Sequence, residues 1–207
     1  MHLIAETLDD LLIKTFRRIL EKGERVYATK GWNSEISAIV LELRNPLARL
    51  SRTETKGTAF SCIGETLWYL AKSNKLNFIE YYLKGYGKFA EADGTVHGAY
   101  GPRLFDMRGK VDQISNVIKL LKKKPSSRQA IIQLFNAEDL LRKYNDIPCT
   151  CTIQFFVRRG SLNVVVHSRR HRALATLIPN FFLAASRLSQ RLRTLSVAKP
   201  KSNGCPD

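Results

Sequence analysis

The stretch DIPCTCTIQFFVRRGSLNVVVHSRR, residues 146–170, decides how the chain folds. Apolar side chains alternate with others on both sides of Gly160, from Ile153 to Val157 and again from Leu162 to Val166. This period-two pattern around a glycine turn predicts a β-hairpin, or two neighbouring strands of one sheet. Both faces carry apolar residues, so we expect both to be covered, by a helix layer or by a second subunit.

A cysteine and an arginine stand at the two ends of this stretch. Cys149 follows Pro148 at the start of the first strand, and Arg169 closes the second strand. A lone cysteine is more often a packing residue than a nucleophile. A neighbouring guanidinium favours the thiolate, which is the nucleophilic form. Pairing of the two strands therefore predicts a thiol and a guanidinium at the same edge of the sheet.

Length and composition indicate a soluble globular protein. The chain has 207 residues, enough for one domain with a sizeable core, and its 44% hydrophobic and 25% charged residues are ordinary values. The longest apolar runs are shorter than a membrane span, and the N-terminus MHLIAETLDD has acidic residues where a signal peptide needs basic ones. We expect a cytoplasmic protein with no membrane partner.

The cysteine pattern argues against a disulfide-rich or metal-binding protein, and the charge pattern makes a nucleic-acid groove the less favoured interpretation. The four cysteines are too few and too scattered for a disulfide framework, and Cys149-Thr150-Cys151 lacks a second ligand pair for a metal. The net charge of +16 suggests nucleic acid, but residues 170–207 concentrate seven basic residues against one acidic residue. The other charges are dispersed, which favours a solvated basic face over a nucleic-acid groove.

The rest of the chain mixes helix and strand signals. Apolar periodicity predicts helices at residues 7–22, 61–72, 111–121 and 137–144 and strands at residues 36–43 and 130–135. Residues 87–105, with several glycines, are predicted to be a loop. After Arg170 the sequence becomes rich in Leu, Ala, Arg and Ser, a pattern compatible with a basic helix broken at Pro179 and equally with an unstructured segment.

Six short motifs occur in a fixed order along the chain. They are GETLWYL at 64–70, AYG at 99–101, DQ at 112–113 with PSSR at 125–128, FN at 135–136, PCTC at 148–151 with QF at 154–155, and SR at 168–169. Each is weak alone, but their order and spacing together are specific. On these motifs the chain, from about residue 24 to 170, resembles the thymidylate synthase family, which includes the pyrimidine-nucleotide hydroxymethylases.

The resemblance implies a fold and an assembly. The family has an α+β fold, in which a large mixed β-sheet carries helices on one face and a homodimer interface on the other. Residues 1–170 would form this domain. The segments with which the family reads the base and holds the sugar hydroxyl do not follow Arg170. We therefore expect a C-terminally incomplete domain, with residues 171–207 as a basic tail that is either a true replacement or out-of-frame translation.

The resemblance also implies a reaction and its catalytic residues. Cys149 would attack C6 of a pyrimidine nucleotide, so that C5 accepts a one-carbon unit from 5,10-methylenetetrahydrofolate, as in the conversion of dUMP to dTMP for nucleotide biosynthesis. Arg169 would favour the thiolate and hold the 5′-phosphate. Glu65 would take part in proton transfers at the pyrimidine ring, and Tyr100 would belong to the same network.

Three more residues are implied to bind substrate. Arg128 would reach the phosphate of the other subunit's nucleotide, Lys30 stands where the family has a phosphate-loop arginine, and Gln154 belongs to the QF motif. Thr150 replaces the family's usual histidine, and Gln129 replaces an arginine.

Two alternatives stay open. One is a hydroxymethylase, which adds water instead of hydride, and the other is an inactive truncated member whose basic surface binds RNA or nothing specific.

Overall fold

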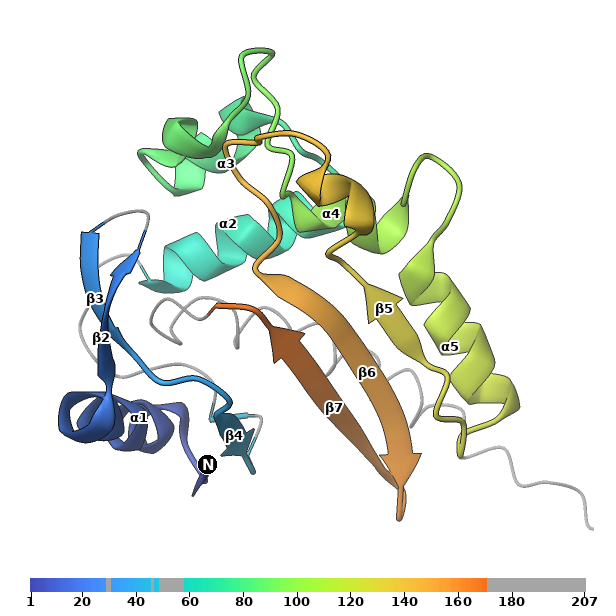
Figure 1. Ribbon diagram of the computed structural model, residues 1–207. Coiled ribbons are helices and arrows are strands. Elements are labelled where there is room, and N and C mark those ends of the chain that lie inside the picture. The colour runs from blue at the N-terminus through green and yellow to red at the C-terminus, as the bar shows by residue number, and fades with distance from the viewer. Residues whose placement is uncertain (29–30, 46, 49–57, 171–207) are drawn as a thin grey trace, which may run out of the picture. The chain divides into compact units, whose positions relative to one another are not determined.

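The computed structural model describes residues 1–28, 31–45, 47–48 and 58–170 (Figure 1). Lys30 and the predicted basic tail lie outside the described residues. The described chain divides into two compact units, residues 1–62 and 63–170. None of the helices described is both long and apolar enough to cross a membrane.

The first unit contains one long helix and two strand pairs. Its elements are β1 (His2–Ala5), α1 (Leu8–Lys22), β2 (Glu24–Ala28), β3 (Gly31–Glu35) and β4 (Val40–Leu43). β1 pairs with β4 in parallel, and β2 pairs with β3 antiparallel. The Thr7 hydroxyl accepts the Asp10 N–H at 3.2 Å and so caps α1. The predicted helix at 7–22 is confirmed, whereas only the second half of the predicted strand at 36–43 is a strand.

The second unit carries the remaining elements. They are most of α2 (Thr58–Leu70), α3 (Leu76–Tyr82), η1 (Tyr86–Phe89), α4 (Tyr100–Phe105), α5 (Gln113–Lys123), β5 (Ile131–Gln133), η2 (Ala137–Leu140), β6 (Thr150–Arg158) and β7 (Ser161–Ser168). The last three strands form one antiparallel sheet in the order β5-β6-β7.

The predicted hairpin is confirmed as β6 and β7. Arg158 pairs with Ser161, and the two turn residues Arg159 and Gly160 both have positive φ, +51° and +73°. Positive φ at both positions matches the twist of paired strands. The register shifts between Thr150 and Thr152, so Cys151 has no partner across the ladder. A bulge of this kind bends the strand where it leaves Cys149.

Helix α5 covers one face of this sheet and lies beside β5 (Figure 1). Its Val117 and Leu121 are buried, as are Ile132 of β5 and Ile153 of β6. The Gln113 side chain ties the start of α5 to the end of β5, since its amide donates to the Gln133 carbonyl at 2.7 Å and accepts the Gln133 N–H at 2.9 Å. The predicted helix at 111–121 is thus present, shifted by two residues.

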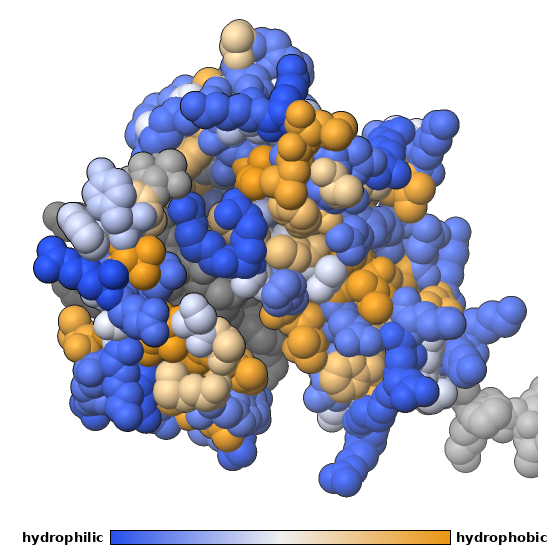
Figure 2. Space-filling view, viewed as in Figure 1, coloured by the Kyte–Doolittle hydropathy of each residue, from blue (hydrophilic) through white to orange (hydrophobic). Residues whose placement is uncertain are grey.

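The other face of the hairpin is more open than the sequence suggests. Val165 of β7 and Ile131 of β5 are 52% and 48% exposed, and both pair with Gln154, on the face opposite the buried Ile153. Figure 2 shows apolar surface over the hairpin, seen from the same side as Figure 1. The expectation that both faces are covered therefore holds for the helix side within this chain, and cover for the other face stays a prediction.

A second core lies beside the sheet in the same unit. Trp68 of α2, Ile79 of α3, Val96 and Ala99 are buried together. Two predictions are wrong in this region. Residues 100–105 form α4 rather than a loop, because Tyr100 and Leu104 lie one turn apart and are both buried. The predicted helix at 137–144 is only the short η2.

The expectation of one large mixed sheet also needs correction for the described residues. Their strands form three separate sheets of two, two and three strands. The β2–β3 hairpin shows why, because most of its residues are exposed on both strands. A strand pair without a buried face gains little from joining a sheet that is packed against a core.

Substitution of Gly64 by alanine should destabilise the fold. A Cβ at this position of α2 would lie 2.2 Å from Cγ and 2.3 Å from Cβ of Tyr82, so α2 and α3 would have to separate. Overpacking of this kind costs about 1–3 kcal/mol in free energy of unfolding. Denaturant titration measures the loss. Gly87→Ala is the matched control, because its Cβ would meet the flexible Glu80 carboxylate at 3.4 Å and Leu76 Cδ2 at 3.9 Å, both ordinary contacts. Equal losses in both variants would contradict the prediction.

Candidate active site around Cys149

Cys149 lies where the two ends of the hairpin meet. Its backbone carbonyl accepts the Arg169 N–H at 2.9 Å and the Ser168 hydroxyl at 3.1 Å. On either side, Pro148 and Thr150 are fully buried, whereas Cys149 is a free cysteine that is only partly buried. The backbone is therefore fixed while the sulfur can be reached from solvent.

The guanidinium of Arg169 lies against the thiol and the chain that precedes it. Its Nε donates to the Pro148 carbonyl at 3.0 Å, its Nη2 donates to the Ile147 carbonyl at 3.1 Å, and Nη2 lies 3.9 Å from the Cys149 sulfur. The hairpin thus brings the thiol and the guanidinium together, as its pattern predicted. A cation at this distance stabilises negative charge on sulfur. Arg169 is exposed overall, so its remaining N–H groups are open to an anion from solvent.

Tyr100 packs behind the thiol, at the start of β6. Its hydroxyl accepts the Thr150 N–H at 3.2 Å and donates to the Thr150 hydroxyl at 3.3 Å. Both residues are buried, with Thr150 fully inaccessible. Burial raises the pKa of Tyr100, and the charges of Cys149 and Asp146 add to the shift, although the bonds to Thr150 oppose it. The phenol is therefore neutral at physiological pH and held in place by the residue that follows the thiol.

Glu65 and Tyr86 are two further residues near the thiol. Glu65 on α2 is only 8% exposed, and Tyr86 packs edge-on against Trp68 with ring centroids 5.6 Å apart. Burial raises the pKa of Tyr86, and the negative charges of Glu65, Asp146 and Cys149 raise it further. These acidic groups therefore lie within electrostatic range of one buried phenol. Sequence reasoning missed Tyr86, because a tyrosine in a glycine-rich segment carries no distinguishing pattern.

Asp146 is the second residue that sequence reasoning missed. Burial raises its pKa, against the opposing charges of Arg169, Arg170 and Arg103. A Cβ on Gly98 would lie 2.3 Å from the Asp146 Oδ2, so the glycine leaves room for the carboxyl group. Its position in the sequence was the available signal for a site residue, because Asp146 stands three residues before Cys149, where the chain enters β6.

A buried ion pair holds the loop that contains Gly98. Arg103 donates to both carboxylate oxygens of Asp139, at 2.8 and 2.6 Å, and to the carbonyls of Leu134 and His97, at 2.7 and 3.0 Å. His97 Nε2 lies 2.7 Å from Asp139 Oδ1. Burial alone would raise the pKa of Asp139, but the bonds from Arg103, the Asn136 N–H and His97 hold it below its usual value. The pair fixes the backbone on which Asp146 rests.

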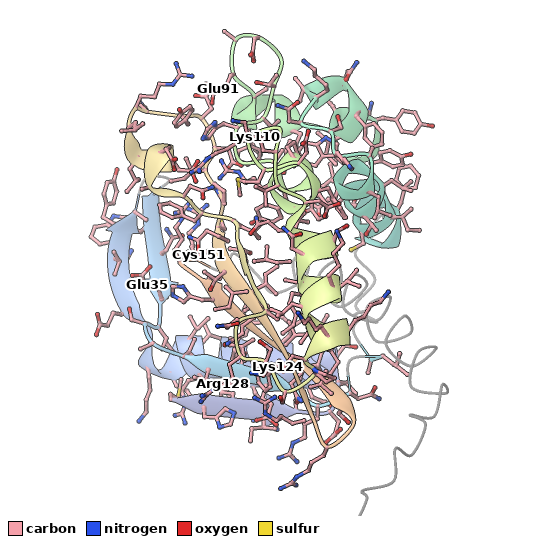
Figure 3. The ribbon with its side chains drawn as sticks, turned by 90° about the vertical axis from the view of Figure 1, so that its right-hand side faces the viewer. Glu35, Glu91, Lys110, Lys124, Arg128 and Cys151 are labelled. Carbon is pink, nitrogen blue, oxygen red and sulfur yellow. The ribbon has the colours of Figure 1, made fainter. Side chains whose placement is uncertain are left out.

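The structure does not bring the remaining predicted residues to the thiol. Arg128 is exposed beyond the end of α5, and Figure 3 shows it near Lys124 and well apart from Cys151. The Gln154 amide donates to the Arg128 carbonyl at 2.8 Å. Gln154 is five residues beyond Cys149, roughly 17 Å along a strand. Lys30 lies outside the described residues, so its predicted role stays a prediction.

The described residues include no group of three or more His, Cys, Asp or Glu side chains placed to hold a metal ion. What they do place together is a reachable thiol beside a guanidinium, with carboxyl groups and two neutral phenols around it. This arrangement suits nucleophilic attack by sulfur on an electrophilic carbon, with proton transfer by the carboxyl groups.

Comparison with known proteins gives two matches. Residues 12–183 match the family model of thymidylate synthase. The deoxyuridylate hydroxymethyltransferase of Bacillus phage SP01 is 27% identical over 164 residues, which is 73% of this chain and 43% of that protein. The chain thus spans less than half the length of this relative. The family match continues past Arg170, where the recognisable motifs end.

Substitution of Asp139 by asparagine should unfold the second unit more easily. It leaves the buried Arg103 guanidinium unpaired, which costs about 3–5 kcal/mol in free energy of unfolding. Because the pKa of Asp139 is lowered in the folded chain, its contribution is fully present above about pH 4 and is lost as pH falls through the lowered value. Denaturant titrations from pH 3 to 7 should show a shallower acid loss in the variant. Glu138→Gln, which breaks only the exposed pair with Arg108, should change stability by less than about 1 kcal/mol, and a similar loss there would contradict the prediction.

Substitution of Arg169 by glutamine should slow alkylation of Cys149. Two unit charges about 4 Å apart interact by about 1 kcal/mol even in water, so loss of the guanidinium should lower the rate at pH 7 about fivefold or more. The rate is followed with iodoacetamide by mass spectrometry of the Cys149 peptide. Arg158→Gln removes an arginine at the other end of β6, the strand that follows Cys149, and should leave the rate unchanged. An unchanged rate in Arg169→Gln would show that the guanidinium does not support the thiolate.

Proposed function

Because the chain belongs to the thymidylate synthase family, we propose that it transfers a one-carbon unit to C5 of a deoxypyrimidine monophosphate through a covalent adduct at Cys149. One observation carries the proposal. The Cys149 sulfur is partly exposed and lies 3.9 Å from the Arg169 guanidinium, at an edge where the backbone is fixed. A pyrimidine has no reactive leaving group at C5, so attack at C6 by such a thiolate is what makes C5 nucleophilic.

The chain's own residues support the individual steps. The thiolate adds to C6 of the base, and the electron pair of the C5–C6 double bond moves toward C5 and the adjacent carbonyl. Glu65 is buried near the phenol of Tyr86, which supports a part for its carboxyl group in proton transfers at the ring. Tyr100 keeps the start of β6 in place through its two bonds with Thr150.

The nucleotide phosphate would bind to arginines. Arg169 has N–H groups left over after its bonds to the Ile147 and Pro148 carbonyls, and a guanidinium matches phosphate geometry. We assign Arg128 to the phosphate of a second subunit's nucleotide, since it is exposed and distant from its own thiol. The exposed Val165 of β7 and Ile131 of β5, on the face that α5 does not cover, support burial of that face in a homodimer.

Methylenetetrahydrofolate, the one-carbon donor of this family, would supply a methylene group that reaches C5 from the open side of the sulfur. Two products are then available. Transfer of a hydride from the remaining tetrahydrofolate, which is oxidised to dihydrofolate, would give the methyl group of dTMP, whereas addition of water would give a hydroxymethyl group. The second product is favoured by the similarity to a deoxyuridylate hydroxymethyltransferase, and the first by the family match as a whole.

A trapping experiment tests the proposal. The chain is incubated with 5-fluoro-dUMP and methylenetetrahydrofolate, and the intact protein is weighed by mass spectrometry. We expect a covalent adduct that contains the nucleotide, because fluorine at C5 cannot leave as a proton does. The adduct should be lost in Cys149→Ala and kept in Cys151→Ala, which removes the neighbouring free thiol.

Turnover of dUMP under the same conditions identifies the product by mass, as dTMP or as the hydroxymethyl nucleotide. Absence of an adduct in a chain whose circular dichroism shows a folded protein would overturn the proposal. If that chain instead slowed the electrophoretic migration of labelled RNA, and did so less at higher salt, the alternative of a basic RNA-binding surface would be supported.

A further inference from the structure

Asp146 has features that a structural carboxyl group lacks. It stands three residues before Cys149 and is partly buried. Among the residues that the structure describes, no hydrogen bond or ion pair within 4.0 Å satisfies its carboxylate. A half-buried carboxylate normally costs free energy unless it is paired, so an open one at a thiol site indicates a partner that arrives from solution.

The backbone around Asp146 is built to admit this side chain. Gly98 lies so close to Oδ2 that any Cβ there would overlap it, and the loop of Gly98 is held by the buried pair of Arg103 with Asp139. Arg169, Arg170, Arg103 and His97 act on the carboxyl group as cations or potential cations, while Tyr86 and Tyr100 feel its negative charge. The carboxyl group therefore belongs to the site and not to the outer surface.

The other candidate bases are less suited to reach a bound nucleotide. Tyr100 has its hydroxyl committed to Thr150, and burial keeps it protonated. Tyr86 is protonated for the same reason. Glu65 is buried, with 8% of its surface exposed, so it is less accessible to a nucleotide that binds from solvent. Of these four groups, Asp146 is the one that is both a carboxyl group and partly open to solvent.

We propose that Asp146 is the base that removes the proton from C5 of the nucleotide while Cys149 is bonded to C6. This inference rests on the proposed function. When C5 carries the one-carbon unit, its C–H bond breaks, the proton passes to an oxygen of Asp146, and the electron pair forms a double bond to the exocyclic carbon as the folate amine leaves. Asp146 then returns the proton to solvent. The same transfer operates without folate, where it exchanges the C5 hydrogen of the nucleotide with water.

Hydrogen exchange at C5 tests the inference separately from turnover. The chain is incubated with dUMP in D2O without folate, and deuterium at C5 is followed by NMR. The unmodified chain should exchange this hydrogen, and Asp146→Asn should slow the exchange about 100-fold or more, as loss of a general base does. Its adduct with 5-fluoro-dUMP and methylenetetrahydrofolate should still form, because no proton leaves C5 in that reaction. Asp106→Asn, the same change at an exposed carboxyl group, should alter neither.

A pH profile and a second variant separate catalysis from a structural role. In the unmodified chain, exchange should rise with pH as Asp146 loses its proton, and this limb should be absent from Asp146→Asn. Gly98→Ala should reproduce the slow exchange, because its Cβ displaces the carboxyl group.

Normal exchange in Asp146→Asn would overturn the inference and leave the proposed function intact. Loss of the fluoro adduct together with exchange would also overturn it, because Asp146 would then be needed for binding or folding. Absence of the adduct from the unmodified chain would defeat the proposed function itself.

Discussion

The backbone hydrogen bond from the Arg169 N–H to the Cys149 carbonyl, 2.9 Å long, is the interaction on which the site depends. It closes the open end of the β6–β7 hairpin and places two residues that are twenty positions apart side by side. The tight turn at Arg159 and Gly160 sets the register that makes this closure possible. A slip of one residue would turn both side chains to opposite faces, so hairpin register and chemistry are determined together.

The segments around the thiol are held in place by contacts between residues that are distant in sequence. Arg103 draws Asp139, Leu134 and His97 together, although they come from three separate segments. A guanidinium suits this task because its donors lie in one fixed plane and can satisfy several acceptors at once. With that centre in place, the loop of Gly98 faces the carboxyl group of Asp146, and η2 is held against the sheet.

The sequence predicts the parts of the fold that local patterns encode. Alternation predicts the hairpin, and apolar periodicity predicts α1 and α5, because in each a single face is buried. It fails for α3, which has no side-chain cap, and for α4, whose six residues are too few to show a period. In the site, the proximity of Cys149 and Arg169 is predicted, because they stand at the open ends of two strands that pair. The place of Tyr86 in the site depends on tertiary packing, which no local pattern reports, and for Asp146 the sequence offers only its position shortly before the strand.

The electrostatics of the site follow from what the reaction must hold. Burial raises the pKa of Tyr86 first, and the charges of Glu65, Asp146 and Cys149 add to the shift, so these acidic groups lie near one another in the site. A cation close to the sulfur offsets the repulsion that such groups exert on a negative charge there. In the proposed reaction Arg169 would supply this cation, and its bonds to the Ile147 and Pro148 carbonyls hold its plane fixed, so that a phosphate could bind without moving it. A lysine would supply the charge at this position but not the fixed plane, and the thiol and the phosphate would then compete for one mobile ammonium group.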